Sequence, residues 1–237
     1  MAATNRERLL AVVQRNVTDT VFLREFRHFH LSVAQKLWSI DYFDRQIAKL
    51  RPEVLYEQRA QGNTLVVDQY TDREGFGLYA NLLLDGILMN AMSTLDTLAH
   101  EITILYRFAR VPSKIYIHTI RDRLNKDHPN CALTNYLKGE LAKPWFETFA
   151  TYRHCTTHES LVGSNVRIEA SLITGDLELV SLPLPDNPRS RPFVYKHGRE
   201  LKSYCHKIGK AVSLVVRHSY QCVMLDVKSA HNVLPIP

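Results

Sequence analysis

The chain has 237 residues, of which 45% are hydrophobic and 23% are charged, and its formal net charge at pH 7 is +6. This composition is typical of a globular protein and excludes a disordered one. The sequence has no run of about 18 apolar residues and does not open on an apolar signal segment, so we expect a cytoplasmic protein with no membrane partner.

The first half of the sequence predicts two long helices. Apolar residues recur at three- and four-residue steps over about residues 17–50, as in an amphipathic helix. A second helix, over about residues 80–110, is apolar on most of its circumference, which predicts that it lies at the centre of the domain. Between the two, Gly75 and Gly77 favour an irregular connection, and residues 64–67 have the composition of a short strand.

The second half predicts shorter helices and a hairpin. Pro144 fits the first turn of a helix, because its missing N–H would be unpaired there in any case. The expected elements are helices near 113–126, 132–142, 144–162 and 193–226, and a β-hairpin at about 167–182. We therefore predict an all-α fold. It is an antiparallel helical bundle with a small β-hairpin insertion, folded as a single domain over residues 1–237 with its core at about 17–165.

The four cysteines predict neither a metal site nor a disulfide framework. They are scattered along the chain without CxxC spacing, at Cys131, Cys155, Cys205 and Cys222. This distribution suits a reducing compartment, and we expect the cysteines to be small packing residues.

One segment of the helix predicted near 144–162 is rich in side chains that can bind a phosphate or transfer a proton. Tyr152-Arg153-His154-Cys155-Thr156-Thr157-His158-Glu159 places a guanidinium, two imidazoles and two hydroxyls close together. An imidazole can take a proton from a ribose 2′-hydroxyl or give one to a leaving oxygen, and a guanidinium stabilises a phosphate in the transition state. Arg153 and His158 are thus candidates for metal-independent cleavage of a phosphodiester.

The spacing of this pair is common in the chain and poses a geometric difficulty. Residues five apart on a straight helix are rotated by about 140° and separated by about 7.5 Å along the axis. A helix break or a second copy of the chain would have to complete the site. An arginine followed after four to six residues by a histidine occurs at Arg24/His30, Arg121/His128, Arg123/His128, Arg153/His158, Arg191/His197 and Arg199/His206.

A purely structural interpretation of the same residues stays open. Arg153 would form an ion pair with Asp96 or Glu101 of the central helix, and His158 would be a hydrogen-bonded packing residue. Asp96 and His100 are four residues apart, and a contact between them would raise the pKa of the histidine and orient its ring.

A zinc site is a further alternative. His154 and His158 have the four-residue spacing of two zinc ligands, and His100 or Asp96 would supply a third. No HExxH or comparable motif surrounds them, so we expect no metal and no cofactor.

Two segments together resemble a known family. Asn90–Ile102, which contains the sequence LDTLAHEI, and Tyr152–Glu159 resemble the two core helices of HEPN-domain proteins, in the bacterial branch with an RxxxxH motif. The resemblance covers about residues 17–165 as helix order and is motif-level over these two segments alone. His154 stands where the family most often has asparagine.

The resemblance implies a HEPN-like bundle and an activity. Members of this family are often homodimers whose motif helices meet across the interface, and many are endoribonucleases that act as toxins or in defence. By this likeness Arg153 and His158 are the catalytic pair, RNA is the substrate, and an antitoxin is a possible partner. The supporting residues would be His154, Asp96, His100, Glu101 and Thr157. Other branches are inactive, so a silent helical dimer that acts as an interaction module is the alternative.

Overall fold

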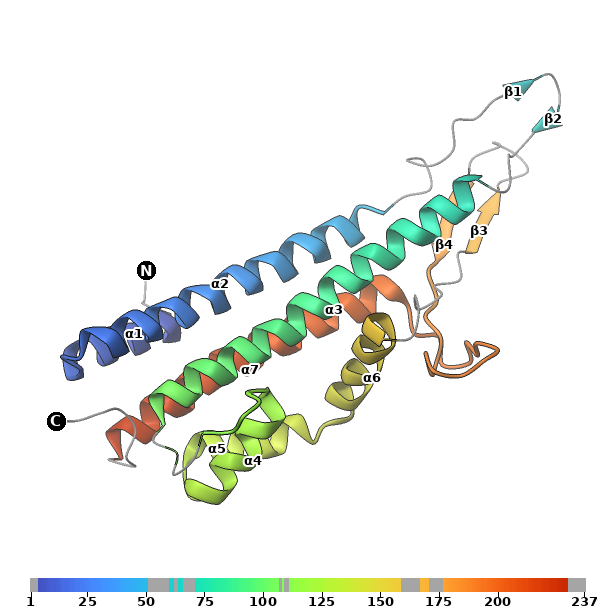
Figure 1. Ribbon diagram of the computed structural model, residues 1–237. Coiled ribbons are helices and arrows are strands. Elements are labelled where there is room, and N and C mark those ends of the chain that lie inside the picture. The colour runs from blue at the N-terminus through green and yellow to red at the C-terminus, as the bar shows by residue number, and fades with distance from the viewer. Residues whose placement is uncertain are drawn as a thin grey trace. The chain divides into compact units, whose positions relative to one another are not determined.

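A computed structural model describes residues 4–50, 60–61, 64–65, 71–106, 108, 111–158, 167–170 and 177–229 of the chain. Within these ranges the side chains of 60–61, 64–65, 71–78, 158, 167–170 and 177–180 are not described. The described residues are mostly helical, which confirms the all-α prediction (Figure 1). The helices are α1 (Asn5–Asn16), α2 (Thr20–Ala48), α3 (Thr71–Leu105), α4 (Ile117–Asp127), α5 (Ala132–Leu141), α6 (Pro144–His158) and α7 (Leu201–Lys228).

Two short antiparallel strand pairs accompany the helices. Strand β1 (Ala60–Gln61) pairs with β2 (Thr64–Leu65). Strand β3 (Arg167–Ala170) pairs with β4 (Leu177–Ser181), with a register irregularity between Arg167 and Ile168. The turn residues 171–176, on which the hairpin prediction rests, lie outside the described residues.

The chain divides into two compact units. Unit 1 is drawn from residues 1–39, 90–148 and 210–237, and unit 2 from residues 40–89 and 149–209. Helices α2, α3, α6 and α7 contribute residues to both units. Each unit is described below by itself.

In unit 1, one buried carboxylate joins two of the helices. The side chain of Asp226 on α7 accepts hydrogen bonds from Tyr106 Oη (2.6 Å), Ala132 N (2.6 Å) and Leu133 N (3.1 Å). The last two are the first backbone N–H groups of α5, which have no partner within the helix. A carboxylate at a helix N-terminus satisfies these donors and also opposes the positive end of the helix dipole. Asp226 therefore fixes α5 to α7 across 94 positions of sequence.

In unit 2, helices α2, α3 and α7 contact one another closely. A Cβ placed on Gly86 of α3 would lie 2.6 Å from Cε1 of Phe43 on α2, so only glycine permits this approach of ring and backbone. Lys202 on α7 donates to the carbonyl of Leu50, which follows α2, at 2.8 Å. His206 on α7 is 2.8 Å from Asp44 on α2. These contacts join α2, α3 and α7 within the unit.

The helix predicted over about 80–110 is present and buries many of its apolar residues, but it begins earlier than expected. Helix α3 buries apolar residues in both units, from Leu83, Leu84 and Ile87 to Ile102. It starts at Thr71, so the prediction of an irregular connection at Gly75 and Gly77 is wrong. A glycine costs only about 1 kcal/mol relative to alanine inside a helix, and a 35-residue helix with a buried face outweighs that cost.

Helix α3 also has the length and composition to cross a membrane. Its stretch Tyr79–Leu105 has a mean hydropathy of 1.2 over the most apolar 18-residue window, and 56% of that window is buried inside the fold. A buried central helix meets the same two criteria.

The start of the last helix also differs from the prediction. Helix α7 begins at Leu201 and not near 193, because the preceding residues fold back on themselves. The backbone N–H of Leu184 donates to the carbonyl of Arg199 at 2.7 Å, and that of Leu201 donates to Leu182 at 2.9 Å. Gly198 supplies the left-handed backbone, with φ of 59°, that this return requires.

The other predicted helices are present with shifted ends. Helix α6 starts at Pro144 as expected and is described to His158, and its predicted continuation to 162 lies outside the described residues. Helices α4 and α5 occupy the positions predicted near 113–126 and 132–142, and they pack on each other.

Candidate functional site

Helix α6 carries the candidate catalytic pair, and its buried face fixes its position in unit 2. Phe149 and Tyr152 are fully buried. Tyr152 Oη donates to the carbonyl of Pro185 and accepts a hydrogen bond from Arg199 Nη1 at 2.9 Å. Burial raises the pKa of Tyr152, although Arg199 opposes the shift, so the phenol remains a neutral donor. The helical turn before Arg153 is thereby held in one orientation.

Arg153 is half-buried and has an unused donor. Its Nε is excluded from solvent, and none of the described residues accepts a hydrogen bond from it. The carbonyl of Arg153 accepts from the hydroxyls of Thr156 (3.0 Å) and Thr157 (2.8 Å). A buried guanidinium N–H without an acceptor is unfavourable unless a ligand or a further residue supplies one.

The remaining residues of the motif lie toward the surface. His154 is exposed, and so is Thr157, whose hydroxyl lies 3.4 Å from the sulfur of Met89 on α3. His158 is the last residue of α6 and its side chain is outside the described part of the chain. Arg153 and His158 therefore stand five residues apart on one continuous helix, and the geometric difficulty of a splayed pair remains.

The supporting residues Asp96 and His100 lie in unit 1, where each has a structural role. Asp96 Oδ1 accepts a hydrogen bond from Ile117 N (3.1 Å) at the start of α4. The His100 ring stacks on Phe29, with ring centroids 5.0 Å apart and planes 6° apart. Asp96 acts to raise the pKa of His100, as expected, but its effect is the weaker of two. Burial lowers this pKa and outweighs the opposite effect of Asp96, so the ring is neutral at pH 7.

Glu101 is the most deeply buried of the supporting residues. Its Oε1 lies 2.7 Å from His30 Nδ1, and its Oε2 accepts a hydrogen bond from Tyr220 Oη at 2.9 Å. The exposed fraction of each of these three residues is at most 2%. Burial and the Glu101 carboxylate raise the pKa of Tyr220 well above its usual range. Glu101 therefore joins α2, α3 and α7 inside unit 1.

Sequence reasoning missed His30 and Tyr220. His30 falls on the same apolar face of α2 as Phe26 and Val33, and a polar residue on such a face signals a buried partner. Neither its spacing nor its type indicates that the partner is Glu101, 71 residues further along the chain.

The predicted site residues are divided between the two units. Arg153, His154 and Thr157 belong to unit 2, and His158 follows them on α6. Asp96, His100 and Glu101 belong to unit 1.

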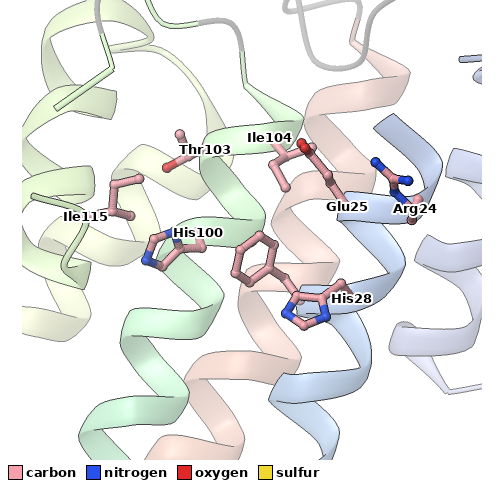
Figure 2. Close-up of a pocket in the computed structure, with 8 residues that line it drawn as sticks. Arg24, Glu25, His28, His100, Thr103, Ile104 and Ile115 are labelled. Atoms are coloured by element: carbon pink, nitrogen blue, oxygen red, sulfur yellow. The ribbon is translucent and has the colours of Figure 1, made fainter. Parts of the chain in front are cut away.

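His100 also lines an open pocket of about 470 Å³ in unit 1 (Figure 2). Sequence reasoning did not find this pocket, because its other residues come from three separate segments of the chain and form no motif. Its walls are formed by α2, α3 and the segment that precedes α4, through Arg24, Glu25, His28, Phe29, His100, Thr103, Ile104 and Ile115.

Within the described ranges, no group of three or more His, Cys, Asp or Glu side chains could hold a metal ion. Comparisons of the chain with protein-family models, with curated proteins and with solved structures found no match.

Proposed function

We propose that this chain is a metal-independent endoribonuclease with a HEPN-like helical bundle, and that Arg153 and His158 of α6 are its catalytic pair. His158 exchanges protons with the ribose 2′-hydroxyl and the 5′-oxygen, and Arg153 binds the phosphate between them. The 2′-oxygen attacks phosphorus and the 5′-oxygen leaves, so the products carry a 2′,3′-cyclic phosphate and a 5′-hydroxyl. By the resemblance of the two motif segments to HEPN proteins, we propose a role in a toxin or defence system.

The main support for this proposal is that Arg153 Nε is buried and has no hydrogen-bond acceptor among the described residues. A half-buried guanidinium whose Nε has no described acceptor is suited to a phosphate, because two phosphate oxygens can accept parallel charge-assisted hydrogen bonds from the planar guanidinium. Both oxygens of Glu101, one of the two carboxylates in the ion-pair interpretation, contact His30 and Tyr220 within unit 1. The net charge of +6 also favours a polyanionic partner.

Two copies of the chain form the active species in this proposal. A single α6 directs positions 153 and 158 about 140° apart, so one helix would not bring both side chains to one phosphate. If two α6 helices meet about a two-fold axis, Arg153 of one protomer and His158 of its partner share a site.

Cleavage of a single-stranded RNA oligonucleotide in EDTA at pH 7 tests the chemistry, with a DNA oligonucleotide of the same sequence as the substrate control. RNA should be cut and DNA left intact, because the attack uses the 2′-hydroxyl. Arg153→Ala and His158→Ala should each lower the rate by about 10²- to 10⁴-fold. His154→Asn should retain or increase it.

Arg123 and His128 provide a matched control, because they have the same five-residue spacing. Arg123 is ion-paired with Asp127 at 2.7 Å, and the ring of His128 packs on Tyr106. Arg123→Ala and His128→Ala should therefore leave the rate unchanged, with melting temperatures measured for every variant. The proposal fails if the wild-type protein cuts no better than a mock preparation, or if both α6 variants cut as well as wild type.

Mixing the two inactive variants tests the shared site. A heterodimer of Arg153→Ala and His158→Ala contains one complete site, so a statistical mixture should recover up to about a quarter of the wild-type activity. No recovery would place both residues of a site in the same protomer.

A catalytically silent interaction module is the second candidate, and exposed side chains on α2 favour it. Leu31 and Trp38, both in unit 1, are 55% and 68% exposed and lie seven residues apart on one face of the helix. If this face forms the dimer, Leu31→Ser with Trp38→Ser should give a monomer in light scattering, whereas Leu225→Ser on α7 should not.

A further inference from the structure

The pocket beside His100 has a lining of flat rings and aliphatic side chains. The Phe29 and His100 rings are nearly parallel, and the His28 ring meets Phe29 edge-on, with centroids 5.2 Å apart and planes at 78°. Ile104 and Ile115 complete the apolar wall. A flat ligand can extend this stack, because aromatic faces attract other aromatic rings in offset or edge-on arrangements.

Polar groups at the same pocket supply both donors and an acceptor. Arg24 and His28 are one helical turn apart on α2, both are exposed, and Glu25 stands between them in sequence. Figure 2 shows these three side chains on one side of the pocket and His100, Thr103 and Ile115 on the other. The carboxylate of Glu25 offsets the charge of Arg24, so the pocket suits an uncharged ligand with its own donors and acceptors better than a multiply charged anion.

We infer that this pocket binds one unstacked purine or pyrimidine base. A nucleobase combines a flat π-face with an edge of hydrogen-bond donors and acceptors, and proteins hold single-stranded bases on Phe, His and Arg planes while contacting that edge. The pocket volume of about 470 Å³ lies in the range that holds a small ligand. Phe29 and His100 form the stacking surface, and Arg24 and Glu25 contact the base edge.

The burial of His100 gives that ring a defined role. Its pKa is lowered by burial, with Asp96 as the weaker opposing influence, so the imidazole that faces the base is uncharged at pH 7. An uncharged imidazole offers one donor and one acceptor and stacks without bringing a second cation beside Arg24.

Free nucleosides test this inference separately from cleavage, because they contain no phosphodiester. Calorimetric titration of the Arg153→Ala protein, which lacks the proposed phosphate-binding residue, with adenosine, uridine, AMP and ribose 5-phosphate distinguishes the base from the phosphate as the group that this pocket recognises. At least one nucleoside should bind, AMP should bind with similar affinity to adenosine, and ribose 5-phosphate should bind at least tenfold more weakly. Equal binding of AMP and ribose 5-phosphate, or binding of neither nucleoside, would overturn the inference.

Variants then locate the bound base. Phe29→Leu should weaken nucleoside binding by about fivefold to a hundredfold, as truncation of a base-stacking ring does. Glu25→Gln and Arg24→Gln should each weaken it severalfold. Arg27→Gln removes the same charge from the same helix without lining the pocket, and should have no effect. If Arg27→Gln weakens binding as much as Arg24→Gln, or if Phe29→Leu leaves it unchanged while melting remains cooperative, the base lies elsewhere and the inference fails.

Discussion

His30 on α2 and Glu101 on α3 are joined by a 2.7 Å contact inside unit 1, and both side chains are almost fully excluded from water. Tyr220 on α7 donates to the other oxygen of the same carboxylate. Three helices distant in sequence thus meet at one polar group, which determines their register as apolar packing alone would not. Misaligning any one of them would leave a buried donor or acceptor unpaired.

Removing the carboxylate should therefore destabilise the fold strongly. Glu101→Ala leaves His30 and Tyr220 buried without an acceptor, and we expect the free energy of unfolding to fall by about 3 kcal/mol or more. Tyr220→Phe removes one hydroxyl and should cost about 2 kcal/mol. Urea denaturation with a common m-value measures both. Equal, small effects of the two substitutions would show that Glu101 does not organise the unit 1 core.

The buried cap of α5 gives a second stability prediction. Asp226→Ala removes three hydrogen bonds, one of them from the buried Tyr106 hydroxyl, and should lower the free energy of unfolding by about 3 kcal/mol. Asp19 is the comparison, because its exposed carboxylate accepts from Val21 N and Phe22 N at the start of α2. Asp19→Ala should cost about 1 kcal/mol. The two values would be similar if burial of the cap contributes nothing.

The partly buried carboxyl of Asp85 on α3 should make the stability of the protein depend on pH. Its Oδ1 is buried with no hydrogen-bond partner among the described residues, and burial raises its pKa to about 6. Between its unfolded pKa of about 3.9 and about 6, the folded state binds more protons than the unfolded state, so stability falls as pH rises through this window.

Asp85→Asn should abolish that decrease. The variant and the wild type should have similar stability at pH 4. At pH 7 the variant should be more stable by on the order of 1 kcal/mol. This is less than the full pKa shift would give, because the carboxyl is partly exposed to solvent. Chemical denaturation at several pH values measures the difference. A difference that does not change with pH would exclude titration of Asp85 as its origin.

Two helical glycines should respond in opposite directions to the same substitution. Gly139 on α5 has no neighbour within 4 Å of an added Cβ among the described residues, so Gly139→Ala should stabilise by about 0.5 to 1 kcal/mol. At Gly86 an added Cβ meets the Phe43 ring, and the resulting overpacking of about 1 to 3 kcal/mol exceeds the gain in helix propensity. Gly86→Ala should therefore lower the melting temperature, and a rise would show that the Phe43 ring moves aside freely.

Sequence patterns predicted the features that depend only on residues close together in the chain. The start of α6 follows from Pro144, and the burial of Phe149 and Tyr152 follows from their spacing along one helix face. The burial of apolar residues along α3 follows from its apolar circumference. The late start of α7 was not predictable, because residues 182–200 are folded back by backbone hydrogen bonds that leave no periodic signal.

The partners of the candidate site residues were the least predictable feature. The sequence analysis named Asp96, His100 and Glu101 as supporting residues on the apolar helix. Their contacts with Ile117, Phe29 and His30 depend on which helices pack together, and composition and spacing do not specify that packing. The assignment of Arg153 and His158 as a catalytic pair stays a prediction.

The cap that Asp226 places on α5 has a consequence for synthesis of the chain. Ala132 leaves the ribosome 94 residues before its capping carboxylate, a delay of about 5 to 20 seconds at translation rates of about 5 to 20 residues per second. All residues of unit 2 have been made by position 209, whereas unit 1 still lacks its last segment. Until Asp226 is made, the first amides of nascent α5 hydrogen-bond to water, so we expect α5 to be fixed to α7 only late in synthesis.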